Sequence, residues 1–129
     1  VLLLGGREDI AVARDLAGQL GPSARTLAGQ TSLAGWAALL KGADAVVAND
    51  SGGMHLAAAV GAPVVGVFGL TDPARTGPLG PRTAVVHDEG PRSRDIARHS
   101  AEAEKRLAAL SPERVYQALL EVTGRGPTS

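Results

Sequence analysis

Residues 45–69 constrain the fold more than any other stretch, because two strand patterns flank a glycine turn there. Residues 45–48 and 64–68 are short apolar runs rich in β-branched side chains, which is typical of parallel strands covered on both faces. An alanine-rich segment between them predicts a helix. A strand, a helix and a second strand in this order form a βαβ crossover. The stretch therefore predicts a parallel sheet within an α/β fold.

The glycine turn of this crossover is a candidate phosphate site. Asp50 and Ser51 lie where a strand ends and a helix begins, and open α/β sheets bind ligands at that edge. Gly52 and Gly53 let a ligand approach the backbone closely. His55 follows Ser51 by four residues, so the two share a helix face. Helix capping by Asp50 or Ser51 is the alternative explanation, but the glycines and the histidine favour a diphosphate site.

A second glycine turn follows the apolar strand at residues 1–4. Gly5 and Gly6 end this strand, and Glu8 opens a helix over about residues 8–19. The third glycine of the G-x-G-x-x-G fingerprint is missing, so an ordinary strand–helix turn is the alternative. If both glycine turns border one cleft, Glu8 is placed to accept hydrogen bonds from ribose hydroxyls, as acidic residues do in other α/β nucleotide sites.

The rest of the chain continues the alternation of strands and helices. Capping signals at Ser32 and at Ser111-Pro112 each open a helix. The further expected elements are strands at residues 25–27 and 83–87, a loop at 69–81, and helices at 33–41, 94–110 and 112–122. The side chains expected to be buried on the first two helices are Ile10, Ala13, Leu16, Ala17, Leu20, Leu33, Trp36, Ala37 and Leu40.

This alternation predicts a doubly wound, Rossmann-like parallel sheet with helices on both faces, which makes three layers. A chain of 129 residues is long enough for one such domain and too short for two. We expect the domain to cover residues 1–123, followed by a tail at 124–129.

Composition excludes several classes of function. The chain has no cysteine, which removes disulfides, thiolate catalysis and cysteine-based zinc sites. Its 13 basic and 13 acidic residues balance, so a nucleic-acid partner is disfavoured. No P-loop pattern occurs, and His87 and His99 lack partners at metal-ligand spacing. We therefore expect neither a metal nor a cofactor.

Several motifs together resemble the C-terminal domain of family 9 glycosyltransferases, which include the ADP-heptose:lipopolysaccharide heptosyltransferases. The most specific one is Asp50-Ser51-Gly52 followed by His55. The others, in order, are Gly61-Ala62-Pro63, Phe68-Gly69, Thr71-Asp72-Pro73, Gly80-Pro81 and Ser111-Pro112-Glu113. The resemblance extends over residues 1–122.

The resemblance implies a GT-B architecture, in which two Rossmann-like halves face a cleft. This chain would be the C-terminal half, which binds the nucleotide-sugar donor. Glu8 would contact the ribose, and the turn around Thr31 the base. The donor-binding residues implied as a set are Gly6, Glu8, Thr31, Asp50, Ser51, Gly52, Gly53 and His55.

The resemblance also implies an inverting, metal-independent transfer from a nucleotide-diphospho-sugar of the ADP-heptose type to a glycolipid or saccharide acceptor. The general base of the family belongs to the N-terminal half. We therefore expect this chain to be an inactive piece of a longer cytoplasmic protein, with association at the inner membrane face left open. A non-catalytic nucleotide-binding module and a GT-B epimerase acting on UDP-sugars are the alternatives.

Two departures from the family stand out. The family uses a basic residue on a first strand of this domain, which would precede residue 1. Some relatives also carry cysteines in the stretch matching residues 88–98, whereas this chain has none, so the acceptor stays undecided.

Overall fold

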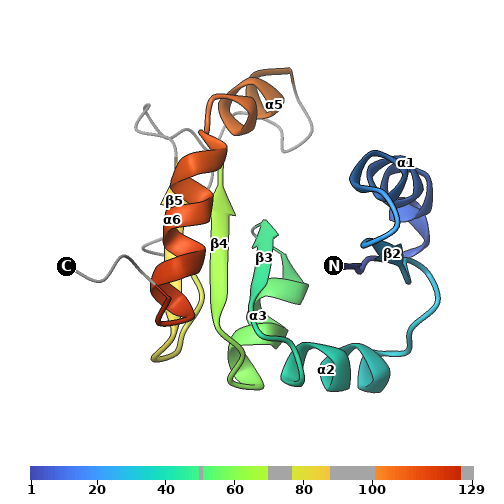
Figure 1. Ribbon diagram of the computed structural model, residues 1–129, viewed down its shortest axis with the longest axis horizontal. Coiled ribbons are helices and arrows are strands. Elements are labelled where there is room, and N and C mark those ends of the chain that lie inside the picture. The colour runs from blue at the N-terminus through green and yellow to red at the C-terminus, as the bar shows by residue number, and fades with distance from the viewer. Residues whose placement is uncertain (50, 70–76, 88–100, 126–129) are drawn as a thin grey trace. The chain divides into compact units, whose positions relative to one another are not determined.

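The computed structural model describes residues 1–49, 51–69, 77–87 and 101–125 (Figure 1). The chain divides into two compact units, Val1–Leu39 and Leu40–Ser129. The boundary falls within helix α2 (Leu33–Lys41), which is the helix predicted at residues 33–41. Ser32 caps this helix as predicted, because its Oγ accepts a hydrogen bond from the Gly35 N–H at 3.0 Å.

The first unit is built on a small parallel sheet. Strand β1 (Leu2–Leu3) pairs with β2 (Arg25–Thr26). A 3₁₀ turn (Arg7–Asp9) and helix α1 (Ile10–Leu20) connect them, so the helix predicted over about 8–19 is confirmed with a tighter first turn. The helix ends at Gly21, whose positive φ of 83° lets its N–H reach the Ala17 carbonyl at 3.0 Å.

The second unit contains the predicted crossover. Its sheet has the order β3-β4-β5 with all strands parallel: β3 is Val46–Asn49, β4 is Val64–Phe68 and β5 is Thr83–His87. Helix α3 (Gly52–Ala59) connects β3 to β4. The βαβ unit predicted from residues 45–69 is therefore confirmed.

Helices lie on both faces of this sheet, which makes three layers. Helix α6 (Pro112–Val122) packs on β4 and β5, as Figure 1 shows, whereas α3 contacts β3 and β4. On the α6 side, Val65 and Val86 pack against Ala118 and Val122. The Oγ of Ser111 accepts from the Arg114 N–H at 3.1 Å, which confirms the predicted cap of α6.

On the opposite face of the sheet, the packing of α3 on β4 depends on Gly66. A Cβ on Gly66 would lie 2.9 Å from the Met54 sulfur and 2.8 Å from Phe68 Cε2. Both side chains are completely buried, so neither can move aside. Gly66 therefore leaves the space in which Met54 of α3 packs onto β4.

Two other elements are described in part. Helix α5 (Ala101–Ala108) falls within the helix predicted at 94–110, whose first residues lie outside the described part. In the loop predicted at 69–81, residues 70–76 are outside the described part, and residues 77–81 form no helix or strand.

The predicted buried stripes are wrong at three leucines. Leu16 and Leu20 on α1 are 41% and 46% exposed, and Leu33 at the start of α2 is 72% exposed. On α1 only Ala13 is buried. The reason is that the sheet beneath α1 has two strands of two residues each, which is too small to cover a wide apolar stripe.

The expectation that residues 45–48 are covered on both faces is wrong at Val47, which is 50% exposed. Val47 lies opposite Val65 in the sheet and therefore on the same face, the one that α6 covers. Because α6 packs on β4 and β5, it leaves Val47 of β3 uncovered.

We expect Gly66→Ala to lower the free energy of unfolding by about 1–3 kcal/mol, because the new methyl overlaps two immobile side chains. Gly18→Ala on α1 is the control, since nothing lies within 4 Å of its Cβ position, and it should raise stability by about 0.5–1 kcal/mol. Urea unfolding measures both, and equal effects would contradict the packing described.

Candidate functional site

The first turn of α3 carries most of the predicted phosphate site. The helix begins at Gly52, and Ser51 precedes it in an extended conformation, with φ −151° and ψ 168°. The Ser51 side chain makes no capping hydrogen bond, so the capping explanation is not supported for this residue. No atom lies within 4 Å of a Cβ position on Gly52, which leaves the backbone open to an approaching group.

The first turn of α3 carries backbone donors at the carboxyl end of β3, where Gly52 is exposed and Gly53 is buried. The Ser51 carbonyl accepts from the Met54 N–H at 3.2 Å and from the His55 N–H at 3.4 Å. The N–H groups of Gly52 and Gly53 precede these bonds and have no acceptor within the helix. Together with the partial positive charge of a helix N-terminus, they suit an anion.

The structure places Ser51, Gly52, Gly53 and His55 together on α3, and the His55 side chain is exposed. Asp50 lies outside the described residues, as does Thr71-Asp72-Pro73.

In the first unit, two carboxylates surround the turn after β1. Asp9 Oδ2 accepts from the Gly6 N–H at 3.0 Å, and the Asp9 N–H donates to the Gly6 carbonyl at 3.1 Å. A Cβ on Gly5 would lie 2.7 Å from Asp9 Oδ2, and one on Gly6 would lie 2.6 Å from Glu8 Oε2. The two glycines therefore allow both carboxylates to lie against the backbone at the carboxyl end of β1.

Asp9 is a residue that the sequence prediction missed. Its spacing was the available signal, because an acid three residues after a turn glycine matches the reciprocal pattern of a capping box. Both acids are exposed, and Asp9 holds the turn through its bond to the Gly6 N–H.

A second turn, at residues 27–30, is closed by the Gln30 N–H, which donates to the Leu27 carbonyl at 2.9 Å, and it lies against the first one. The Gly29 N–H donates to the Gly5 carbonyl at 2.9 Å. Gly29 has a φ of 73°, and a Cβ there would lie 2.8 Å from Ile10 Cδ1. Thr31 directly follows this second turn, at the same end of the small sheet as Gly6 and Glu8.

The two groups of predicted residues lie in different units, so their common cleft stays a prediction. Two surface depressions of the second unit, of about 150 and 330 Å³, run along β5 and α6, and predicted site residues line neither of them.

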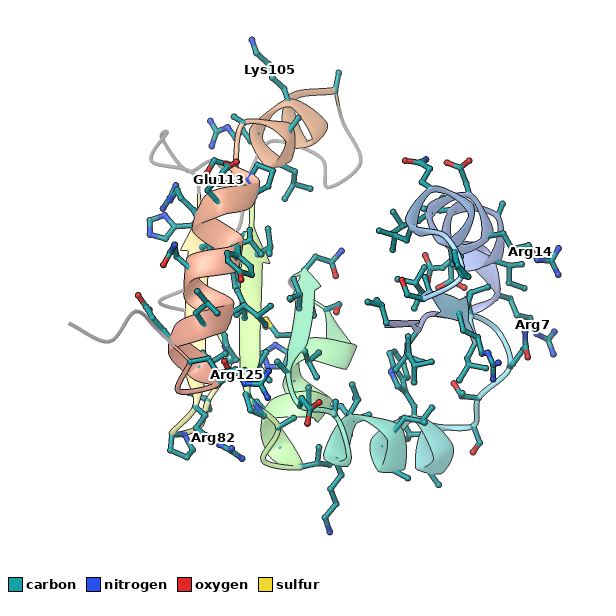
Figure 2. The ribbon with its side chains drawn as sticks, in the orientation of Figure 1. Arg7, Arg14, Arg82, Lys105, Glu113 and Arg125 are labelled. Atoms are coloured by element: carbon teal, nitrogen blue, oxygen red, sulfur yellow. The ribbon has the colours of Figure 1, made fainter. Side chains whose placement is uncertain are left out.

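Two arginines have structural partners. Arg82 lies at the amino end of β5, away from the carboxyl edge where α3 begins (Figure 2), and its Nη2 donates to the Gly61 carbonyl at 2.8 Å. Arg114 Nη1 donates to the His87 carbonyl at 3.2 Å and holds α6 to the end of β5.

Within residues 1–49, 51–69, 77–87 and 101–125, no three side chains of His, Asp or Glu are grouped closely enough to hold a metal ion. No helix in that same part of the chain is both long and apolar enough to cross a membrane.

Comparison with known proteins decides the family. The sequence profile of glycosyltransferase family 9 (heptosyltransferase) matches residues 1–106. The chain belongs to glycosyltransferase family 9. Lipooligosaccharide heptosyltransferase 2 of Haemophilus influenzae is 37% identical over 90 residues, which are 67% of this chain and 26% of that relative.

Solved structures of the family share the fold. ADP-heptose LPS heptosyltransferase II of E. coli matches 97% of this chain with a TM-score of 0.79 and 28% identity. A family 9 glycosyl transferase of Veillonella parvula has a TM-score of 0.77 at 22% identity, which supports the fold alone. These matches confirm the predicted fold class, an α/β fold with parallel sheets of the GT-B kind. The chain spans 26% of the curated relative and 36% of each solved structure.

We expect Asp9→Ala to destabilise the first unit by about 1 kcal/mol, because the Gly6 N–H loses its acceptor. Asp15→Ala is the matched control: in the described part of the chain the exposed Asp15 accepts a hydrogen bond from the Gln19 side chain, so its loss should cost less than about 0.5 kcal/mol. Amide exchange of residues in α1 measures both effects. A larger loss for Asp15→Ala would contradict the assignment.

Proposed function

We propose that this chain is the part of a heptosyltransferase-type glycosyltransferase that binds the nucleotide-sugar donor. One observation carries the proposal: α3 begins at the carboxyl end of β3 with an open glycine and a serine hydroxyl that caps nothing. Such an arrangement suits a diphosphate. Membership of family 9 supports the same conclusion, and the E. coli structure is described as an ADP-heptose LPS heptosyltransferase.

In this proposal the donor-binding domain covers residues 1–123, and each group of residues binds a different part of the donor. Ser51, Gly52, Gly53 and His55, with Asp50 beside them, bind the diphosphate and the sugar. Gly6 and Glu8 bind the ribose, and the turn at Thr31 lies against the base. The turn before Thr31 lies on the Gly5-Gly6 turn, which supports a shared role for Gly6, Glu8 and Thr31 because it holds them at one end of the small sheet.

The proposed reaction is a direct transfer with inversion at the anomeric carbon. A base outside this chain removes the proton from the acceptor hydroxyl while the bond between the sugar and the diphosphate breaks. The N–H groups of Gly52 and Gly53 and the His55 ring stabilise the charge that develops on the leaving diphosphate. Those groups make a metal unnecessary, and the missing base makes residues 1–129 inactive alone.

The proposed acceptor is a glycolipid or saccharide, since the relatives are named as lipooligosaccharide and lipopolysaccharide heptosyltransferases. We place the reaction in the cytoplasm, where nucleotide sugars would be available, with association at the inner membrane face.

The role of His55 can be tested directly by mutation in the full-length protein. We expect His55→Ala to lower kcat at least about tenfold, because a donor to the leaving diphosphate is lost. His55→Gln, which keeps an N–H donor, should recover part of that loss. Gln117→Ala, at an exposed position of α6, is the control and should leave turnover unchanged. Unchanged kinetics for both His55 variants would overturn this assignment.

The role of Glu8 is tested by calorimetry with nucleotides alone. We expect Glu8→Ala to weaken ADP binding about 10- to 100-fold, because hydrogen bonds between the ribose and a carboxylate are lost. Binding of 2′,3′-dideoxy-ADP should be equally weak in both proteins. Parallel titrations with UDP and GDP identify the base. A variant that binds ADP as well as the wild type would exclude Glu8 from the ribose site.

A further inference from the structure

The outer edge of β5 can pair with another strand. The Val64 N–H donates to the Arg82 carbonyl at 2.9 Å, so the Arg82 carbonyl points toward β4. Successive residues of a strand direct their backbone groups to opposite sides, which places the N–H and carbonyl of Val85 on the side away from β4. In the part of the chain that the structure describes, β5 is an edge of its sheet.

The strand itself lacks the features that commonly protect an edge. Lysine, proline and bulges are usual protections against pairing with another chain. Thr83–His87 contains no lysine and no proline, and its register with β4 is unbroken. Val85 at its centre is 36% exposed. The sequence of β5 therefore leaves its outer edge able to accept a partner strand.

Helix α6 places charges of both signs beside this edge. Arg114, Gln117 and Glu121 are exposed and line the depression of about 330 Å³ together with Val85. Their spacing of three and four residues puts them on one flank of the helix. Glu113 also lines the depression, but it lies about 100° around the helix from Arg114. This flank of α6 therefore has a basic end and an acidic end.

The charge pattern of the flank is complementary to itself. A twofold axis perpendicular to the sheet sets two copies of α6 antiparallel, so that Arg114 of each copy lies opposite Glu121 of the other. Interfaces between identical chains require this reciprocity. The same axis can pass through the middle of β5, because Val85 lines the same depression as Gln117. One axis therefore suits both the strand and the helix.

The spacing of strands and helices agrees with this arrangement. Neighbouring strands lie about 4.8 Å apart, so an axis halfway between two β5 strands lies about 4.8 Å from the midline of β4 and β5. Helix α6 packs on these two strands. The α6 helices of two copies would then lie about 10 Å apart, at the upper end of the usual distance of about 8–10 Å between packed helices.

We propose that β5 pairs in antiparallel orientation with β5 of a second copy of this protein. Arg114 of each copy forms an ion pair with Glu121 of the other, and the Val85 N–H and carbonyl groups bond across the axis. Arg114 keeps its bond to the His87 carbonyl, because a guanidinium group has further N–H donors. The two sheets then continue into one.

Analytical ultracentrifugation of the full-length protein tests the association. We expect particles of two copies, with a dissociation constant below about 100 μM. A particle that contains a single copy at about 100 μM protein would overturn the proposal.

Charge reversal tests which surface pairs. We expect Glu121→Arg and Arg114→Glu each to raise the dissociation constant at least about tenfold, because like charges then meet twice across the axis. An equimolar mixture of the two variants should associate as the wild type does, because both ion pairs form again between unlike copies. A mixture that stays dissociated, or a Glu121→Arg variant that associates normally, contradicts the assigned surface.

Tyr116→Arg is the matched control on the same helix. Tyr116 is 57% exposed and lies about 140° around α6 from Glu121, so it is not on the proposed flank. This variant should leave the dissociation constant unchanged. An equal loss of association in Tyr116→Arg and Glu121→Arg would show a general effect of charge and would rule out the specific ion pair.

Amide exchange of the unaltered protein gives a measurement that needs no variant, since Arg114→Glu also removes the bond to the His87 carbonyl. The protein is diluted from about ten times to about a tenth of its dissociation constant. We expect the Val85 N–H to lose protection on dilution, whereas the Ala84 N–H, which points toward β4, keeps it. Protection of Val85 that does not change identifies an occupant within the same chain and overturns the proposal.

Discussion

The parallel pairing of β3 with β4 is the constraint on which the second unit depends. Parallel neighbours require a crossover, so α3 must begin where β3 ends and return along one face of the sheet. Met54 packs onto β4 only because Gly66 carries no side chain. This contact places α3 against the sheet, with its first turn at the carboxyl end of β3. The candidate phosphate site is thus a consequence of how the crossover closes.

Glycines also allow close contacts in the first unit. Gly5 and Gly6 let two carboxylates lie against the end of β1, and the positive φ of Gly29 brings the next turn onto them. The result is a rigid pair of turns at the carboxyl ends of two parallel strands. In both units, backbone geometry shapes the predicted binding surface, while Arg82 and Arg114 donate to carbonyls and hold elements together.

The comparisons identify the family and its fold, and the geometry of α3 concerns the proposed binding site. The profile match and the solved relatives establish glycosyltransferase family 9 and its fold. The first turn of α3 supplies a physical reason why such a fold would bind a diphosphate at Ser51 and Gly52. The chain spans 26% of the curated relative and 36% of the E. coli structure.

Local patterns in the sequence were sufficient for the helices at 33–41 and 112–122 and the strands at 64–68 and 83–87, which have the predicted bounds. Periodicity and capping depend on neighbouring residues, so they can be recognised without a fold. The serine and glycines of the α3 turn were also evident, because their motif is contiguous. The bond between Asp9 and Gly6 is also local, and its spacing could have been recognised. Only the tertiary structure decided that Gly66 makes room for Met54 and that Val47 stays exposed. Both depend on which elements pack on each face of the sheet, and the order of residues along the chain does not determine that.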